Sequence, residues 1–420
     1  MKLSANRSTI GFIAVAVALI VIVQLLISLG VLSAFWTTLL NIGAVMAIVS
    51  LGLNLIYGFN GQFSLGQWGF YAIGAYAAAD VTYRWSQDKS ASGLVILLLV
   101  VILVALAFVG TAYLLSKLRG LDALSAFAMY LIGVVTAVVL AVVIGGVLIM
   151  PVTSLLQFLP ADFALQVVFL LAVLLAGCLA AEISYLFGLP VLTLGSDYFG
   201  IATLGFTIIV KVLLDNSDTM LGFVEMKGAR GMVGIPKLSS WLWVSLFLLL
   251  ILIATRNLLQ SSNGRAILSV REDEIAAKAM GIDVAHQKIL TFVIGSLFAG
   301  LAGGLYAHVN GFLHPNTFNF IKSFDPMIIV VFGGLGSVSG TVVAAFTWAL
   351  VLEGFLRIWL PEGFETWRFV VYPLLLLIMM LLRPKGLLGA FEFPFLRAVL
   401  PPLRKRTGNA ASEAAPGEGG

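Results

Sequence analysis

The sequence predicts an all-α integral membrane protein, a polytopic bundle of about 10–12 spanning helices of which some are broken or re-entrant. Of its 420 residues, 60% are hydrophobic and only 10% are charged, whereas soluble domains carry about a quarter charged residues. Several apolar runs reach the roughly 20 residues that a spanning helix needs. Because these runs are continuous and do not alternate with polar residues, they argue against a membrane β-barrel.

Taken in order, the apolar runs predict eleven full spans and one half-helix. The glycines between positions 333 and 340 interrupt one run, so we expect a half-helix, a turn and a full helix there. Lys and Arg at the ends of the runs place both termini in the cytoplasm by the positive-inside rule. The expected spans are 10–35, 36–57, 70–83, 93–115, 123–150, 163–187, 191–211, 241–253, 289–309, the interrupted run 326–354, and 369–382.

One charged segment, Gly264–Lys288, lies between apolar spans. Its charges cannot lie in hydrocarbon without partners, and its alanines favour a short helix outside the bilayer. Arg271 and Glu272 interrupt the apolar stripe of that helix, so we expect a docking surface for another protein and not a part of the core. We call residues 262–286 the coupling segment. It belongs to a transmembrane domain, 1–395, and we expect the cytoplasmic tail that follows, 396–420, to be disordered.

Two polar, helix-breaking segments also lie between apolar runs, at Gly61–Gln67 and Gly333–Gly340. Non-helical backbone at membrane depth is tolerated only where protein or a watery cavity satisfies its amides, so such breaks line translocation pathways. An ordinary turn between two spans is an equally good interpretation. If the breaks do line a pathway, they converge with Tyr198–Gly205 near the centre of the bundle. The pathway residues are then Asn60, Gly61, Ser64, Gly66, Gln67, Tyr198, Thr203, Gly205, Gly333, Gly334, Gly336 and Ser337.

The sequence also argues against several kinds of chemistry. Ionisable residues within the spans are few, chiefly Glu182, Lys211 and Glu353, whereas a proton- or sodium-coupled carrier needs such groups near the bilayer centre. The single cysteine, Cys178, permits no intrachain disulfide. The chain has no phosphate-binding loop motif and no metal-ligand spacing. We therefore expect no catalytic residues, no metal and no cofactor on this chain. If ATP drives the activity of this protein, another chain must bind the ATP.

Seven sequence blocks, in this order, resemble the permease subunits of branched-chain amino-acid ABC importers of the LivM type. Each block alone is modest evidence, but seven in the right order are specific to that family. Together they cover most of the chain between positions 52 and 389. The blocks are GLNLIYGFNGQFSLGQWGFYAIGAYAAA, YFGIATLGFTIIVKVLLDN, KGARGMVGIP, GRAILSVREDEIAAKAMGI, FAGLAGGLYAH, VVFGGLGSVSGTVVAA and LRPKGLLG.

The resemblance implies the fold of an ABC importer permease in the cell (inner) membrane, working by alternating access. The partners it implies are a homologous second permease, two cytoplasmic ATPase subunits that carry ATP and Mg, a substrate-binding protein and the lipid bilayer, but no nucleic acid. The coupling segment resembles the family's EAA loop, which docks into the ATPase. The residues assigned to this docking are Arg265, Arg271, Glu272, Glu274, Ala276, Ala277 and Gly281.

Within the coupling segment we expect one helix, on which Arg271 and Glu274 are neighbours and Ala276, Ala277 and Gly281 form a ridge of small residues for the ATPase. Leucine, isoleucine and valine are the default cargo of the family, and relatives carry other amino acids, urea or short amides. A secondary carrier without an ATPase is the alternative from another class. A structural membrane subunit is a third.

Overall fold

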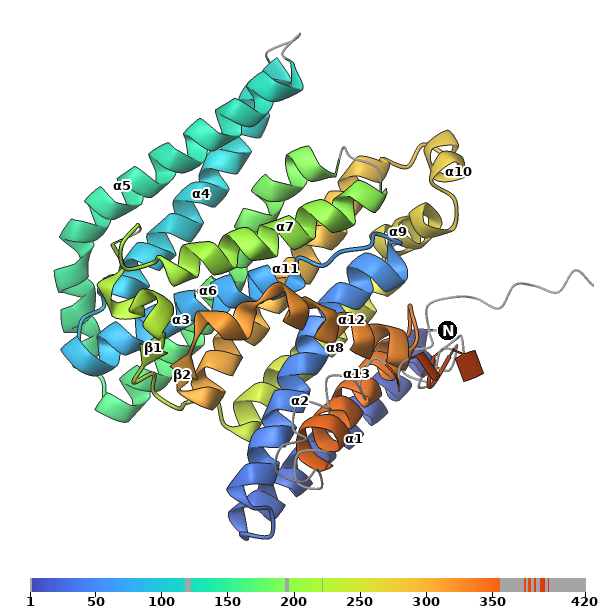
Figure 1. Cartoon of the computed structure of the whole chain (residues 1–420), viewed down its shortest axis with the longest axis horizontal. Helices are drawn as coiled ribbons and strands as arrows, with labels where there is room; N and C mark the ends of the chain where they lie inside the picture. The colour runs from blue at the N-terminus through green and yellow to red at the C-terminus, as the bar shows by residue number, and fades with distance from the viewer. Residues whose placement is uncertain are drawn as a thin grey trace, which may run out of the picture.

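The computed structural model describes residues 2–117, 122–192, 196–220 and 222–355, and positions 374, 377, 378, 381, 382, 386–389 and 392. Apart from β1 (Met232–Val233) and β2 (Phe312–Leu313), the elements in these residues are helices (Figure 1). The longer ones are α1 (Lys2–Ser28), α2 (Ala34–Leu53), α3 (Gln67–Asp88), α4 (Ser92–Lys117), α5 (Ala123–Gln157), α6 (Ala161–Val191), α7 (Ser196–Asp215), α8 (Trp241–Gln260), α9 (Ser262–Glu272), α11 (Val284–Asn310), α12 (Phe324–Gly333) and α13 (Val338–Thr347). The shorter ones are α10 (Glu274–Ala279), the 3₁₀ turns η2 (Val224–Met226), η3 (Gly228–Arg230), η4 (Pro315–Phe318) and η5 (Phe320–Ser323), and the π-helices η1 (Asn54–Phe59) and η6 (Trp348–Phe355).

Eight helical segments among the described residues are long and apolar enough to cross a membrane, which confirms the all-α, multi-span fold class. Segment Ile13–Ser28 of α1 is shorter than these eight, and α3 is not one of them. The expected tail, 396–420, and all but isolated positions of the expected last span, 369–382, lie outside the described residues. The eight are Ala34–Phe59, Ser92–Lys117, Leu124–Gln157, Ala161–Val191, Tyr198–Asp215, Trp241–Gln260, Val284–Asn310 and Val338–Phe355.

The interruption expected in the run 326–354 is confirmed, because α12 ends at Gly333 and α13 begins at Val338. Two other irregularities were not expected. The last turns of the α2 segment and of the α13 segment are π-helical, in η1 and η6. π-Helical turns are rare and occur mostly at functional sites, and both of these lie beside the features described below.

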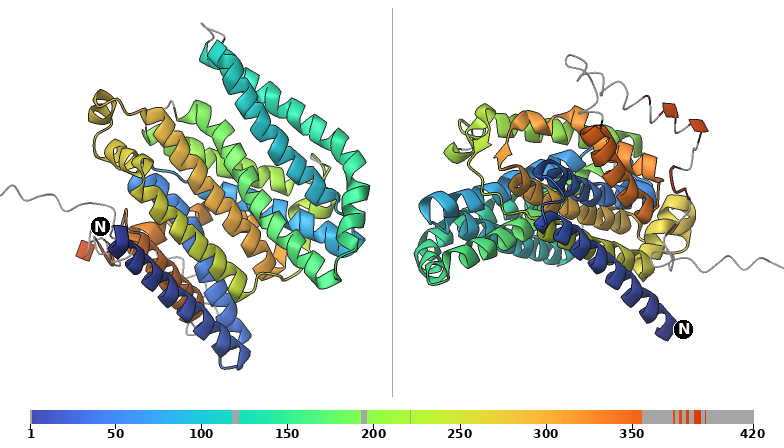
Figure 2. Two further views of the ribbon diagram at one scale, coloured as in Figure 1. Left: turned by 180° about the vertical axis from the view of Figure 1, so that it is seen from behind. Right: turned by 90° about the horizontal axis from the view of Figure 1, so that it is seen from below.

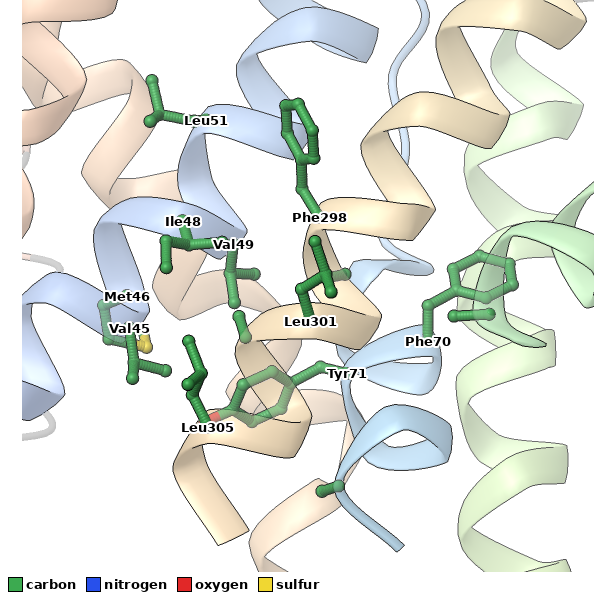
Figure 3. Close-up of a cluster of buried hydrophobic side chains, with 14 of the residues drawn as sticks. Val45, Met46, Ile48, Val49, Leu51, Phe70, Tyr71, Phe298, Leu301 and Leu305 are labelled. Atoms are coloured by element: carbon green, nitrogen blue, oxygen red, sulfur yellow. The ribbon is translucent and has the colours of Figure 1, made fainter. Parts of the chain in front are cut away.

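The core of the bundle is built around α2 and α11. Helix α11 packs against α2, α3 and α6, and Figure 3 shows side chains of α2, α3 and α11 meeting between the helices. Without a hydrophobic driving force between helices in lipid, close approach depends on small residues. A Cβ on Gly303 would collide with the carbonyl oxygen of Tyr71, and one on Gly74 with that of Gly300. Helices α3 and α11 are therefore in backbone contact.

Helices α4 and α5 form a hairpin at one edge of the molecule, as Figures 1 and 2 show. They pack on each other, and most of their large apolar side chains are exposed. An apolar exposed surface of this extent on membrane-length helices is a lipid-facing or subunit-facing surface. The apolar stretch 123–150 thus lies outside the core and does not shape the centre of the bundle.

The loops gather at two opposite ends of the bundle. β1 and β2 pair with Met232 opposite Leu313, which joins the segments 215–237 and 310–325 at one end. The coupling segment, with α9 and α10, lies at the other end (Figure 1).

The seam between α3 and α11 gives a test of the packing. Gly303→Ala should lower the free energy of unfolding by about 1–3 kcal/mol, because the new methyl group meets backbone that cannot move aside. The control is Gly110→Ala in α4, where a Cβ meets nothing within 4 Å. Thermal melting of the purified protein in detergent measures both, and equal melting temperatures for the two variants would contradict the close packing.

Candidate functional site: the helix breaks and the coupling segment

The first break, residues 60–66, follows the π-helix η1 and is held against α7. The amide of Leu65 donates to Thr203 Oγ1 at 3.0 Å, and Thr207 Oγ1 donates to the carbonyl of Leu65 at 3.2 Å. A Cβ on Gly66 would lie 3.1 Å from Thr203 Cβ. Two hydroxyls on one face of α7 therefore satisfy backbone groups that no helix satisfies, as the membrane interior requires.

The second break, residues 334–337, is held by Asn54, the first residue of η1. Asn54 Nδ2 donates to the carbonyl of Ser337 and to Thr341 Oγ1, both at 2.9 Å. Its Oδ1 accepts from the amide of Gly336 at 2.9 Å. Gly334 and Gly336 have φ of +115° and +78°, a region that favours glycine. The buried side chain of Asn54 thus hydrogen-bonds to a backbone N–H and to a backbone carbonyl of this turn.

Arg271, from the end of α9, reaches both breaks. Its Nη1 donates to the carbonyl of Gly58 at 2.7 Å. The same atom lies 2.8 Å from the position that a Cβ on Gly336 would take, and a Cβ on Gly61 would lie 3.6 Å from Arg271 Cα. A guanidinium keeps its charge and offers donors in several directions. Arg271 therefore joins the coupling segment to the start of one break and to the turn of the other.

The coupling segment is two helices, and the prediction of one helix is wrong. Asp273 has extended backbone, with φ −159° and ψ 108°, and its side chain caps α10 by accepting from the amides of Ile275 and Ala276. Arg271 and Glu274 are consequently not neighbours on one helix. Glu274 pairs instead with Lys288 Nζ at 2.8 Å. Asp is among the preferred residues at a helix N-cap, so this start could have been predicted.

The expected ridge of small residues is only partly present. Ala277 is 4% exposed and packs with Val270 and Val284 inside the coupling segment, so it is not available to a partner. The side chains that do protrude are Ile275, 82% exposed, and Met280, 83% exposed. Ala276 and Gly281 are also exposed.

Helix α9 is also more deeply packed than the sequence indicates. Ile267 is fully buried in the main core, and the backbone of Gly264 lies against Leu258 and Leu259 of α8. Arg265 is exposed and donates to the carbonyl of Gln260. The segment is therefore anchored through α9 and presents α10 to its surroundings.

Two of the three predicted pathway segments meet, because Thr203 of the Tyr198–Gly205 segment accepts from the amide of Leu65 in the first break. The second break contacts η1 through Asn54. Tyr198 is 67% exposed, and a Cβ on Gly205 would meet nothing within 4 Å, so neither lies at these contacts. Ser64, Gln67 and Ser337 are buried, and Ser337 Oγ caps α13 by accepting from the amide of Gly340.

A cavity of about 230 Å³ lies where the first break meets the coupling segment. Asn60, Gly61 and Gln62 form one wall, and residues 271–274 with Lys288 form the other. Asn54 was missed as a site residue by the sequence analysis, although an asparagine inside an apolar run directly before a break is a usable signal. Arg271 was assigned to a partner, whereas its side chain points into its own chain.

The family described as "Branched-chain amino acid transport system / permease component" matches residues 35–380. The chain belongs to this family. No solved structure matches it.

Individual relatives carry the same description. The high-affinity branched-chain amino acid transport system permease protein LivM of Salmonella typhimurium is 32% identical over 275 residues, which cover 57% of this chain and 60% of that protein. The probable LivM of Methanocaldococcus jannaschii is 26% identical over 57% of this chain and 72% of its own length. LivH of Escherichia coli K12 is 28% identical over 43% of this chain and 55% of LivH. The chain thus matches less than two thirds of the Salmonella protein's length.

The Asn54 contacts give a test of the second break. Asn54→Ala should destabilise the protein by about 1–3 kcal/mol for each buried group left without a partner. Hydrogen exchange should accelerate at residues 334–341 before it does so elsewhere. Asn216→Ala, which removes a half-buried asparagine whose side chain donates to the carbonyl of Val212 in the adjoining α7, is the matched control. Unchanged exchange at 334–341 in Asn54→Ala would show that the turn is held by other contacts.

Proposed function

We propose that this chain is the permease subunit of an ATP-driven importer that moves branched-chain or related small amino acids across the cell membrane by alternating access. Membership of the permease family and the likeness to LivM and LivH support this function. The structural observation that carries it is the Arg271 contact, because it joins the coupling segment at the end of the bundle to both helix breaks within the bundle.

In this proposal the chain does no covalent chemistry. Two ATPase subunits bind ATP and Mg, a homologous second permease completes the membrane part, and a substrate-binding protein delivers the cargo. Ile275 of α10 and Met280, which directly follows α10, enter a cleft of the ATPase, since large exposed apolar side chains are typical anchors at an interface. Both termini and the coupling segment then face the cytoplasm, and the β1–β2 end faces the binding protein.

Motion of the ATPase reaches the bundle through α9. When the two ATPases close on ATP, α10 moves with them, and Arg271 carries the displacement to Gly58 and to the turn at Gly336. Both sites are helix ends with glycine, where the backbone can change φ and ψ at low cost. The bundle thereby exchanges an inward-open for an outward-open arrangement.

Met280→Glu tests the docking of α10. A charge at a packed apolar anchor should weaken the complex by about 2 kcal/mol or more, so recovery of the ATPase with the permease should fall at least tenfold. Met220→Glu is the matched control, because Met220 is 69% exposed and lies outside the coupling segment. Full recovery of the ATPase with Met280→Glu would exclude α10 as its dock.

Arg271→Met tests the link between docking and transport. The ATPase should still co-purify, because the exposed face of α10 is intact, but uptake and the stimulation of ATP hydrolysis by the binding protein should each fall about tenfold, the effect of losing one charge-assisted hydrogen bond. Arg230→Met, an exposed arginine in η3, is the control. Loss of co-purification in Arg271→Met would show that Arg271 serves docking and not transmission.

A further inference from the structure

A second cavity, of about 250 Å³, lies in the half of the bundle away from the coupling segment, where it is lined by the first turns of α2 and the last turn of α11. It lies between α2, α3, α11, the segment that joins η4 to α12, and the π-helix η6. We infer that this cavity is the site at which the permease receives a free amino acid from outside, an inference that rests on the proposed import function. The residues around it are Phe35, Thr38, Leu39, Ile42, Met46, Trp68, Tyr71, Tyr306, Thr317, Lys322, Asp325, Trp348 and Glu353.

Charges of both signs line this cavity. Lys322 lies there with Asp325 and Glu353, and Lys322 Nζ is 3.2 Å from Asp325 Oδ2. The side chains of Lys322 and Asp325 are 28% and 14% exposed, so their pair is largely withdrawn from water. The ammonium group of Lys322 can bind the carboxylate of an amino acid, and the carboxylates of Asp325 and Glu353 can bind its ammonium group. These contacts would replace the ion pair between Lys322 and Asp325. Urea and short amides carry no net charges and cannot replace an ion pair in this way.

One face of α2 forms an aliphatic wall. Leu39, Ile42 and Met46 recur at helical spacing of three and four residues, so they stand in a row along the cavity. Such a row removes the side chain of a bound leucine, isoleucine or valine from water, and methionine adapts to differences in branching. The wall therefore fits the apolar part of the ligand while the charged residues fit its two ends.

The opposite wall is aromatic and fixed. Trp68 stacks on Tyr71 with ring centroids 4.6 Å apart, and Tyr71 contacts Tyr306 at 5.3 Å. Trp68 Nε1 donates to the carbonyl of Thr317 at 3.0 Å, which sets the indole against the loop that carries Lys322. Aromatic faces attract an ammonium group. A wall held in this way is already shaped before a ligand enters, which reduces the entropy lost on binding.

The cavity is closed on the side that faces the coupling segment. Beyond Met46, the next residues of α2, among them Ile48, Val49 and Leu51, are fully buried within the main core (Figure 3). Asn54 and the second break follow in the same helix line. The order along α2 is thus receiving cavity, packed layer, and the helix break that Arg271 contacts. This order is what alternating access needs of a site that is open to one side at a time.

The size of the aliphatic wall gives the decisive experiment. The full complex is reconstituted in vesicles, and uptake of leucine and of valine is measured with the same binding protein throughout. Ile42→Trp should lower leucine uptake about tenfold more than valine uptake, since one methylene in a tight apolar pocket changes specificity by that order. Met46→Ala should raise the ratio of leucine uptake to valine uptake. Ile102→Trp, on the exposed side of α4, should leave the ratio unchanged.

Lys322→Gln and Asp325→Asn complete the test. Both should reduce uptake of leucine and valine together, while the binding protein still stimulates ATP hydrolysis. Loss of that stimulation would mean that these charges dock the binding protein, and would overturn the cavity as the receiving site. An unchanged leucine-to-valine ratio in Ile42→Trp and Met46→Ala would overturn it as well. A wild-type complex that imports neither these two nor any other branched-chain or small amino acid would instead overturn the proposed function itself.

Discussion

The whole arrangement depends on one constraint, that a backbone amide or carbonyl within a membrane protein must find its partner inside the protein. Each interruption of a helix therefore recruits a specific side chain. Thr203 and Thr207 do this for the first break, and Asn54 for the second. Arg271 adds a charged donor at the carbonyl of Gly58. Because these partners come from distant parts of the chain, the breaks are also the points at which separate elements are tied together.

Two π-helical turns contribute residues to the two sites, one to the helix breaks and one to the receiving cavity. η1 supplies Asn54 and Gly58 to the contacts around Arg271, and η6 supplies Trp348 and Glu353 to the receiving cavity. A π-turn widens the helix by one residue and so changes the direction in which the following side chains point. Both lie against α2, which runs the length of the core between the two sites.

The sequence predicted the helices well because lipid makes strong demands on composition and length. It also predicted the interruption at 333–340, since glycines in that number cannot continue a helix interior without cost. It could not predict that Arg271 turns inward, because the carbonyl of Gly58 that it binds lies more than two hundred residues away in the chain. Ala277 is buried because it packs on Val270 and Val284, and the separate helix start at Asp273 that allows this was a signal the sequence offered. Lys322 and Glu353 are distant from α2 in the sequence and lie near it only in the folded chain, and no sequence pattern predicts that proximity.

The pair between Glu274 and Lys288 gives the coupling segment a second connection. Lys288 lies in the second turn of α11, and α11 is in backbone contact with α3 through Gly303 and Gly74. A displacement of α10 therefore enters the molecule by two routes of different stiffness. One runs through Arg271 into glycine turns that bend readily, and the other through Lys288 into a two-helix block that can move only as a whole. In the proposed mechanism the first route acts on the breaks, and the second acts on the helices that carry Tyr71 and Tyr306.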